Sequence, residues 1–122
     1  MFTTSNLSNL FAEIKSEVVK YNAEYLIKHP SDWDCCGFAS LKVYFGRGRK
    51  LKNAMMEAGL LGHSYKDWKG THFMITIPTM FVPCVGHQSL TYKENRCRVI
   101  MAVMIKHFPE LEGKIMKESY MD

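Results

Sequence analysis

The chain has 122 residues, a formal net charge of +4 and 47% hydrophobic residues. This length fits one hydrophobic core, and the apolar content is too high for a disordered chain. We therefore predict one α+β domain over residues 1–122, with an N-terminal helix within 1–30 and a core over 35–122. No apolar stretch approaches the ~20 residues of a membrane-spanning helix, and the N-terminal residues lack the basic and then apolar pattern of a secretory signal, so a cytoplasmic protein without membrane insertion is expected.

The first predicted element is a long helix from Asn6 to Lys28. His29-Pro30 ends it, because proline disfavours helical geometry in the residue before it. Apolar residues recur along this segment at steps of three and four, which places them on one helix face; they are Leu7, Leu10, Phe11, Ile14, Val18, Tyr21 and Tyr25.

The next segment alternates in polarity from Gly37 to Phe45, which predicts a strand with one face in the core. A glycine-rich basic turn follows, and apolar residues then recur at helical spacing. We predict a short second helix over 49–61, with Gly59 and Gly62 as stop signals.

A second alternating segment from Thr71 to Ile77 predicts another strand, which Pro78 ends. The residues just before it, starting at Tyr65, are assigned to a loop. Residues 80–85 are a candidate third strand, which Pro83 would restrict to a sheet edge.

Thr91 and Glu94 match a capping box, so a third helix is expected to begin there. Its body, residues 97–108, is apolar on almost every side and should be buried. After Pro109 and Gly113, residues 114–121 are predicted to form a final strand.

The resulting fold class is α+β, a small sheet of three to four strands with helices packed on one face, preceded by the long N-terminal helix. The opposite face of the sheet is expected to be solvated, with a ligand platform as the alternative. Its predicted side chains are Ser40, Lys42, Tyr44, His72 and Thr76.

Several short landmarks give the chain a resemblance to a group of uncharacterised tailed-bacteriophage proteins. In chain order they are Cys36-Gly37-Phe38-Ala39, Gly46 followed by basic residues, Tyr65-Lys66 with Gly70, Gln88-Ser89, Lys93-Glu94 and Ser119-Tyr120-Met121-Asp122. Two positions depart from that pattern, with Ser40 where an aromatic residue is usual and Tyr120 where arginine is usual. If that arginine binds a ligand, the departure puts the same ligand in doubt here.

The resemblance implies a context rather than an activity. A small protein of a bacteriophage is expected to serve host takeover or anti-defence in the cytoplasm of the infected bacterium. Such proteins often bind a nucleotide signal, a nucleic acid or a host protein without catalysis.

Two positively charged segments are the candidate binding residues. In the first, Arg47, Arg49 and Lys50 surround glycines before a helix start, where backbone N–H groups and guanidinium groups can hold phosphate. In the second, Trp68 lies between Lys66 and Lys69 and could stack on a base. A solvated basic turn and a tryptophan covering a core edge are the respective alternatives.

The cysteines suggest two minority interpretations. Cys84 and His87 with Cys35 and Cys36 are zinc-ligand types, but adjacent cysteines rarely chelate one ion together, so reduced thiols without a metal are expected. A Cys36 or Cys84 nucleophile with His72 or His87 as base would make a small enzyme, although no catalytic signature surrounds either cysteine.

The leading hypothesis is therefore an accessory binding protein that captures an anionic ligand, a nucleotide or a nucleic-acid segment, without catalysis and without a cofactor. The alternatives are a protein–protein inhibitor of a host factor and a small cysteine-dependent enzyme. A homodimer is left open by the sequence.

Overall fold

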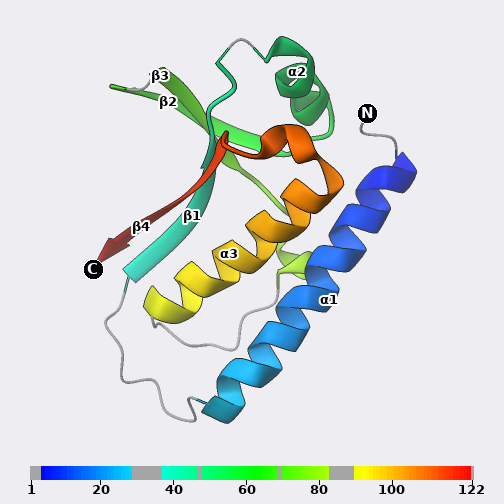
Figure 1. The fold of residues 1–122 in the computed structure, drawn as a ribbon, viewed down its shortest axis with the longest axis vertical. Helices are drawn as coiled ribbons and strands as arrows, with labels where there is room; N and C mark the ends of the chain where they lie inside the picture. The colour runs from blue at the N-terminus through cyan, green and yellow to red at the C-terminus, as the bar shows by residue number, and fades with distance from the viewer. Residues whose placement is uncertain (1–3, 29–36, 47, 69, 83–89, 122) are drawn as a thin grey trace.

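The computed structural model describes residues 4–28, 37–46, 48–68, 70–82 and 90–121, and within these ranges it has three α-helices and four β-strands (Figure 1). Two 3-10 turns, η1 and η2, follow β3 and α3. The elements in chain order are α1 (Thr4–Lys28), β1 (Gly37–Val43), α2 (Arg49–Glu57), β2 (Leu61–Asp67), β3 (Gly70–Ile75), η1 (Thr79–Phe81), α3 (Leu90–His107), η2 (Pro109–Leu111) and β4 (Ile115–Met121).

The four strands form one sheet in the order β2-β3-β1-β4, and every neighbouring pair is antiparallel. Strands β1 and β2 are consequently parallel to each other with β3 between them, and β3 and β4 are related in the same way across β1. The chain from β1 to β4 therefore contains two split βαβ units. In β1-α2-β2 the intervening strand is β3, and in β3-α3-β4 it is β1. The predicted α+β class is confirmed.

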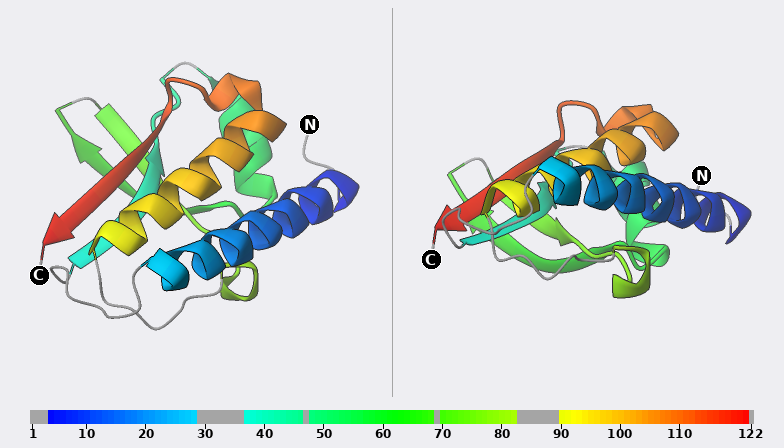
Figure 2. Two further views of the ribbon diagram at one scale, coloured as in Figure 1. Left: turned by 60° about the horizontal axis from the view of Figure 1, so that its bottom comes forward. Right: turned by 90° about the horizontal axis from the view of Figure 1, so that it is seen from below.

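The helices pack on one face of this sheet, where the core lies (Figure 2). Alternation along β1 buries Leu41 and Val43 in that core, in the same cluster as Ile100 and Met104 of α3. The predicted strands 37–45, 71–77 and 114–121 match β1, β3 and β4 within two residues. The helix predicted from Asn6 to Lys28 is α1.

Helix α1 contacts α3 through a tyrosine cluster and an ion-pair cluster. The Tyr92 hydroxyl donates to Asn22 Oδ1 at 2.6 Å, and the Tyr21 hydroxyl donates to the Tyr92 carbonyl at 3.0 Å. Further along the helix pair, Lys106 Nζ and His107 Nε2 lie 2.9 and 3.1 Å from the Glu13 carboxylate. Because these contacts flank the buried Ile14 and Val18, they fix the rotation of α1 about its axis.

The prediction that residues from Tyr65 onward form a loop is wrong, since Leu61–Asp67 is strand β2. This strand lies at the sheet edge, and the five consecutive residues from Gly62 to Lys66 are exposed. Its pairing with β3 also shifts register between Leu61 and Ser64. An edge strand that is exposed and bulged has no two-residue polarity pattern, so periodicity could not reveal it.

Three predicted boundaries also differ from the structure. The second helix ends at Glu57 and not at 61, and the described part of the proposed strand 80–85 is the turn η1 and Val82, with 83–85 outside the described residues. Helix α3 begins at Leu90, one residue before the expected capping threonine. The Glu94 carboxylate accepts a 2.6 Å hydrogen bond from Lys117 Nζ, which ties α3 to β4.

A glycine-dependent cap ends α2 earlier than expected. Gly59 has φ of 74°, its N–H donates to the Met56 carbonyl at 3.1 Å, and the Leu60 N–H donates to the Met55 carbonyl at 3.0 Å. These two bonds are the Schellman pattern, which needs a left-handed residue after the helix. Leu60 is fully buried, so this cap directs the chain from α2 into the core before β2 starts.

Gly59→Ala should destabilise the protein by about 1 kcal/mol, because a Cβ atom disfavours the left-handed conformation. Among the described residues, no atom beyond the adjacent chain lies within 4 Å of the place where this Cβ atom would stand, so the loss would come from the backbone rather than a clash. Gly59→Asn should lose less stability than Gly59→Ala, since asparagine tolerates the left-handed conformation. Urea unfolding measures both, and an alanine variant as stable as the unchanged protein would contradict the capping role.

Burial raises the pKa of Tyr21 to about 12, with the neighbouring Tyr25 and Tyr92 adding to the shift. Between pH ~10 and ~12 the unfolded chain has lost this proton while the folded protein keeps it, so stability falls as pH rises. Tyr21→Phe should therefore be less stable at neutral pH, but should lose stability less steeply over that range. Urea unfolding at several pH values tests this, with Tyr65→Phe at an exposed site as control; equal slopes in all three proteins would contradict it.

Candidate anion-binding site

Positive charge gathers at one end of the sheet. At this end β1 stops, β2 turns into β3, β4 starts and α2 begins, as Figure 1 shows for α2 and the hairpin. The Tyr44 N–H donates to the Lys114 carbonyl at 2.9 Å and joins the end of β1 to the residue before β4. We call this region the basic end, and its described cations are Arg49, Lys50, Lys52, Lys66 and Lys114.

The five cations of the basic end form no ion pair with a carboxylate among the described residues, a property that they share with Lys15, Lys20 and Lys28 of α1. Ion pairs elsewhere occupy cations of the sheet and of α3, at distances of 2.6 to 3.2 Å. Those pairs are Lys42 with Glu118, Lys106 with Glu13 and Lys117 with Glu94. No ion pair therefore neutralises these five side chains, although Lys114 Nζ donates a 3.4 Å hydrogen bond to the Glu110 carbonyl.

The start of α2 lies at the centre of the basic end and has no side-chain cap. Gly48 is the N-cap residue and no acidic residue occupies the first turn, where Arg49 and Lys50 stand instead. Cations at the positive end of a helix dipole cost roughly 0.3–1 kcal/mol each. An anion bound there would be attracted by both side chains and by the N–H groups of the first turn.

A cavity of about 410 Å³ adjoins this helix start. Leu51, Ala54 and Phe108 give it an apolar wall, while Lys50 and Lys114 contribute positive charge and Glu110 one carboxylate. Ligand pockets commonly measure about 300–1,000 Å³ and combine apolar walls with a few polar groups. The cavity therefore has the size and lining for a small anionic molecule with an apolar part.

Glycine at position 48 keeps the turn before α2 tight. The Gly48 N–H donates to the Phe45 carbonyl at 2.8 Å, and a Cβ atom on residue 48 would lie 3.1 Å from that same oxygen. The Lys114 side chain passes 3.8 Å from the same Cβ position. The segment that follows β1 and the segment that follows η2 therefore lie close together at the cavity, where Gly48 and Lys114 both contribute to the lining.

The remaining cations of the basic end lie on the helix side of the sheet. Lys52 Nζ lies 5.3 Å from the centre of the Phe73 ring, which faces the core. Lys66 is two residues along β2 from Ser64, whose partner is Phe73, so alternation places Lys66 on that side as well. Tyr65 consequently points to the opposite face.

The opposite face carries a row of three rings across β2, β3 and the end of β1. The His72 ring lies 5.6 Å from the Tyr65 ring and 5.0 Å from the Tyr44 ring. Lys42 Nζ lies 5.5 Å from the Tyr44 ring centre and 3.2 Å from Glu118. His72 is buried, whereas Tyr65 is 52% exposed and is the ring in this row most accessible to a ligand.

Four of the six sequence-predicted binding residues lie at this end of the sheet, namely Arg49, Lys50, Lys66 and Trp68; Arg47 and Lys69 lie outside the described residues. Trp68 is 89% exposed at the β2–β3 turn, so it does not cover a core edge. Sequence reasoning missed Lys114 and Tyr65. Finding Tyr65 required β2, and finding Lys114 required the contact between the end of β1 and the start of β4.

The zinc and cysteine-enzyme alternatives rest almost entirely on residues outside the described part of the chain, so both stay untested. Burial raises the pKa of the Cys97 thiol, which opposes thiolate formation. Within the described part of the chain, no group of three or more histidine, cysteine, aspartate or glutamate residues could hold a metal ion. Cys35, Cys36, Cys84 and His87 lie outside it, and His72, the other base considered for catalysis, is described and buried.

Comparisons of the chain with protein-family models, curated proteins and solved structures gave no significant match. Among the described helices, none has the length and apolar character needed to cross a membrane.

Proposed function

We propose that this protein binds an anionic ligand, a nucleotide or a nucleic-acid segment, at the basic end and without catalysis. The observation that carries the proposal is the uncapped start of α2, with Arg49 and Lys50 in its first turn and a cavity beside it. The resemblance in sequence extends the proposal to an accessory protein of a bacteriophage, serving host takeover or anti-defence in the host cytoplasm.

Phosphate recognition would use the helix side of the basic end. Arg49 can grip two phosphate oxygens at once, Lys50 and Lys114 add positive charge, and the first N–H groups of α2 donate hydrogen bonds. The apolar wall around Phe108 can contact the non-phosphate part of a ligand in the cavity. None of these roles requires bond breaking, which is why we propose binding alone.

Base recognition would use the exposed aromatic side chains of the β2–β3 hairpin. Trp68 and Tyr65 are 89% and 52% exposed, and they lie three residues apart in sequence. Stacking on such rings tolerates any base and contributes about 1–3 kcal/mol per base. A ligand with several nucleotides could therefore contact the hairpin with its bases and α2 with its phosphates.

The double substitution Arg49→Ala with Lys50→Ala should weaken binding about tenfold or more, because two phosphate contacts are lost. Fluorescence anisotropy with a labelled single-stranded oligo-dT probe measures this, with ATP and inorganic phosphate as competitors. The dependence of log affinity on log salt should also become shallower by roughly 0.7 per lost contact.

The matched control is Lys15→Ala with Lys28→Ala, which removes the same charge from exposed positions on α1. Its affinity should stay within about twofold of the unchanged protein. Equal losses in the two double variants would indicate attraction by net charge alone and would contradict the site. Absence of binding to all three anions would contradict the function and favour the alternative of a host-protein inhibitor.

Trp68→Ala should weaken oligonucleotide binding by about 5- to 150-fold, the range expected for one stacked base. The inhibition constant of inorganic phosphate, calculated with the probe affinity of each variant, should be unchanged, since phosphate has no ring to stack. Trp68→Phe should recover part of the affinity. If all three proteins bind the oligonucleotide equally, the hairpin has no part in recognition.

A further inference from the structure

The face of α1 that points away from the core is uncharged and partly apolar. Five residues, at successive steps of four, three, four and three, occupy it; they are Ala12, Ser16, Val19, Ala23 and Leu26. We call them the outer seam. All five are exposed, and the two largest, Val19 and Leu26, are 48% and 45% exposed.

The spacing of the outer seam is that of the a and d positions of a coiled coil. The inner face of α1 already packs against the core through Leu10, Ile14 and Val18, so the outer seam is a second, separate stripe. A surface helix needs only one such stripe to fold against its own domain. Small residues at three of the five positions would let another helix approach closely.

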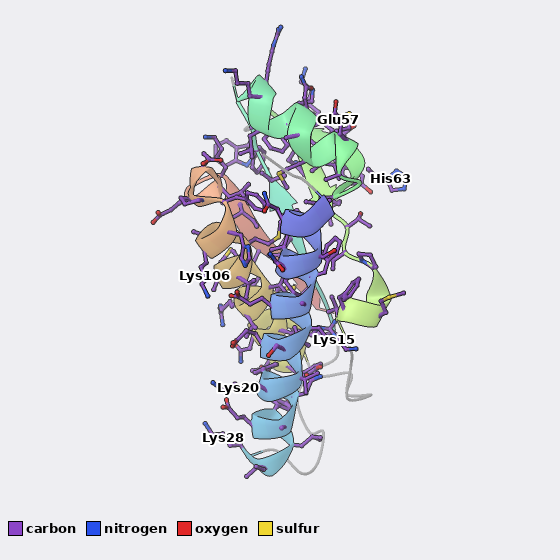
Figure 3. The ribbon with its side chains drawn as sticks, turned by 90° about the vertical axis from the view of Figure 1, so that its right-hand side faces the viewer. Lys15, Lys20, Lys28, Glu57, His63 and Lys106 are labelled. Carbon is purple, nitrogen blue, oxygen red and sulfur yellow. The ribbon has the colours of Figure 1, made fainter. Side chains whose placement is uncertain are left out.

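Charges beside the outer seam favour a particular occupant. Figure 3 looks onto α1 and shows Lys15 on one side of the helix and Lys20 and Lys28 on the other. Lys20 and Glu24 are exposed and one helical turn apart on the same flank. An antiparallel copy centred between Val19 and Ala23 would place its own Lys20 and Glu24 opposite this pair, which gives two lysines and two glutamates in one cluster.

A parallel copy is disfavoured by the same charges. In a parallel pair, residues flanking the seam meet those five positions further along the partner helix. Lys15 would then face Lys20 of the second copy, and this repulsion would occur twice. The charge pattern is therefore self-complementary in the antiparallel orientation only.

We propose that the outer seam binds a second copy of this chain, so that two α1 helices pair antiparallel in a weak homodimer. From Ala12 to Leu26 the seam spans about 21 Å at 1.5 Å per residue. One helix face of this length buries less than the roughly 800 Å² per partner of a standard interface. A dissociation constant of order 10⁻⁵ M is expected.

Sedimentation equilibrium over about 1–500 µM protein, which brackets this constant, tests the proposal. The unchanged protein should shift from monomer to dimer across that range. In the dimer of Lys20→Glu the cluster would contain four glutamates, and in that of Glu24→Lys it would contain four lysines. Because like charges repel, each single variant should dimerise at least tenfold more weakly. The double variant, Lys20→Glu with Glu24→Lys, restores the cluster with its charges exchanged and should recover the dimer.

Ala23→Glu, which places a charge in the centre of the seam, should stay monomeric throughout the range. Circular dichroism should show the same helix content in every variant, because all the substituted side chains are exposed. A protein that is monomeric at the highest concentration would overturn the proposal. An unchanged dissociation constant in Ala23→Glu and in both single charge reversals would overturn it too, since the dimer contact would then lie on another face. Ligand binding at the basic end is measured separately and uses none of these residues.

Discussion

Burial of α3 between α1 and the sheet is the constraint on which the rest of the structure depends. Helix α3 contacts α1 on one side and β1, β4 and η2 on the other. Its buried residues, among them Ile100, Val103 and Met104, join the apolar faces of both layers into one cluster. Because apolar burial is the main favourable term in folding, the positions of α1 and of the sheet both follow from this one helix.

Elements with a buried face were predictable, whereas those defined by geometry were not. Steps of three and four identified α1, and alternation identified β1 and β3. Strand β2 was not predicted, because its residues from Gly62 to Lys66 are exposed to water and its pairing register with β3 shifts beside Leu61. The early end of α2 was not predicted, because Gly59 and Gly62 were equivalent stop signals in the sequence. Of these two glycines, only Gly59 has the left-handed backbone conformation that ends the helix.

The candidate site divides in a similar way. Local composition was enough to select Arg49, Lys50, Lys66 and Trp68, because a basic turn at a helix start and an aromatic residue among lysines are visible in a short window. It could not show that Lys66 and Tyr65 lie on different faces, or that Lys114 joins Lys50 around one cavity. Those relations depend on strand register and on contacts between distant parts of the chain.

The central position of β1 has a kinetic consequence. Its neighbours are β3 and the last strand, β4, and Lys42 bonds to Glu118 across a separation of 76 residues. The contacts between α1 and α3 are equally remote, with Tyr92 and Asn22 separated by 70 residues. Since closing long loops costs entropy before the contacts they allow are formed, such topologies fold slowly for their size. The sheet therefore becomes complete late in folding, and until then β1 exposes an edge on which strands of other chains could pair.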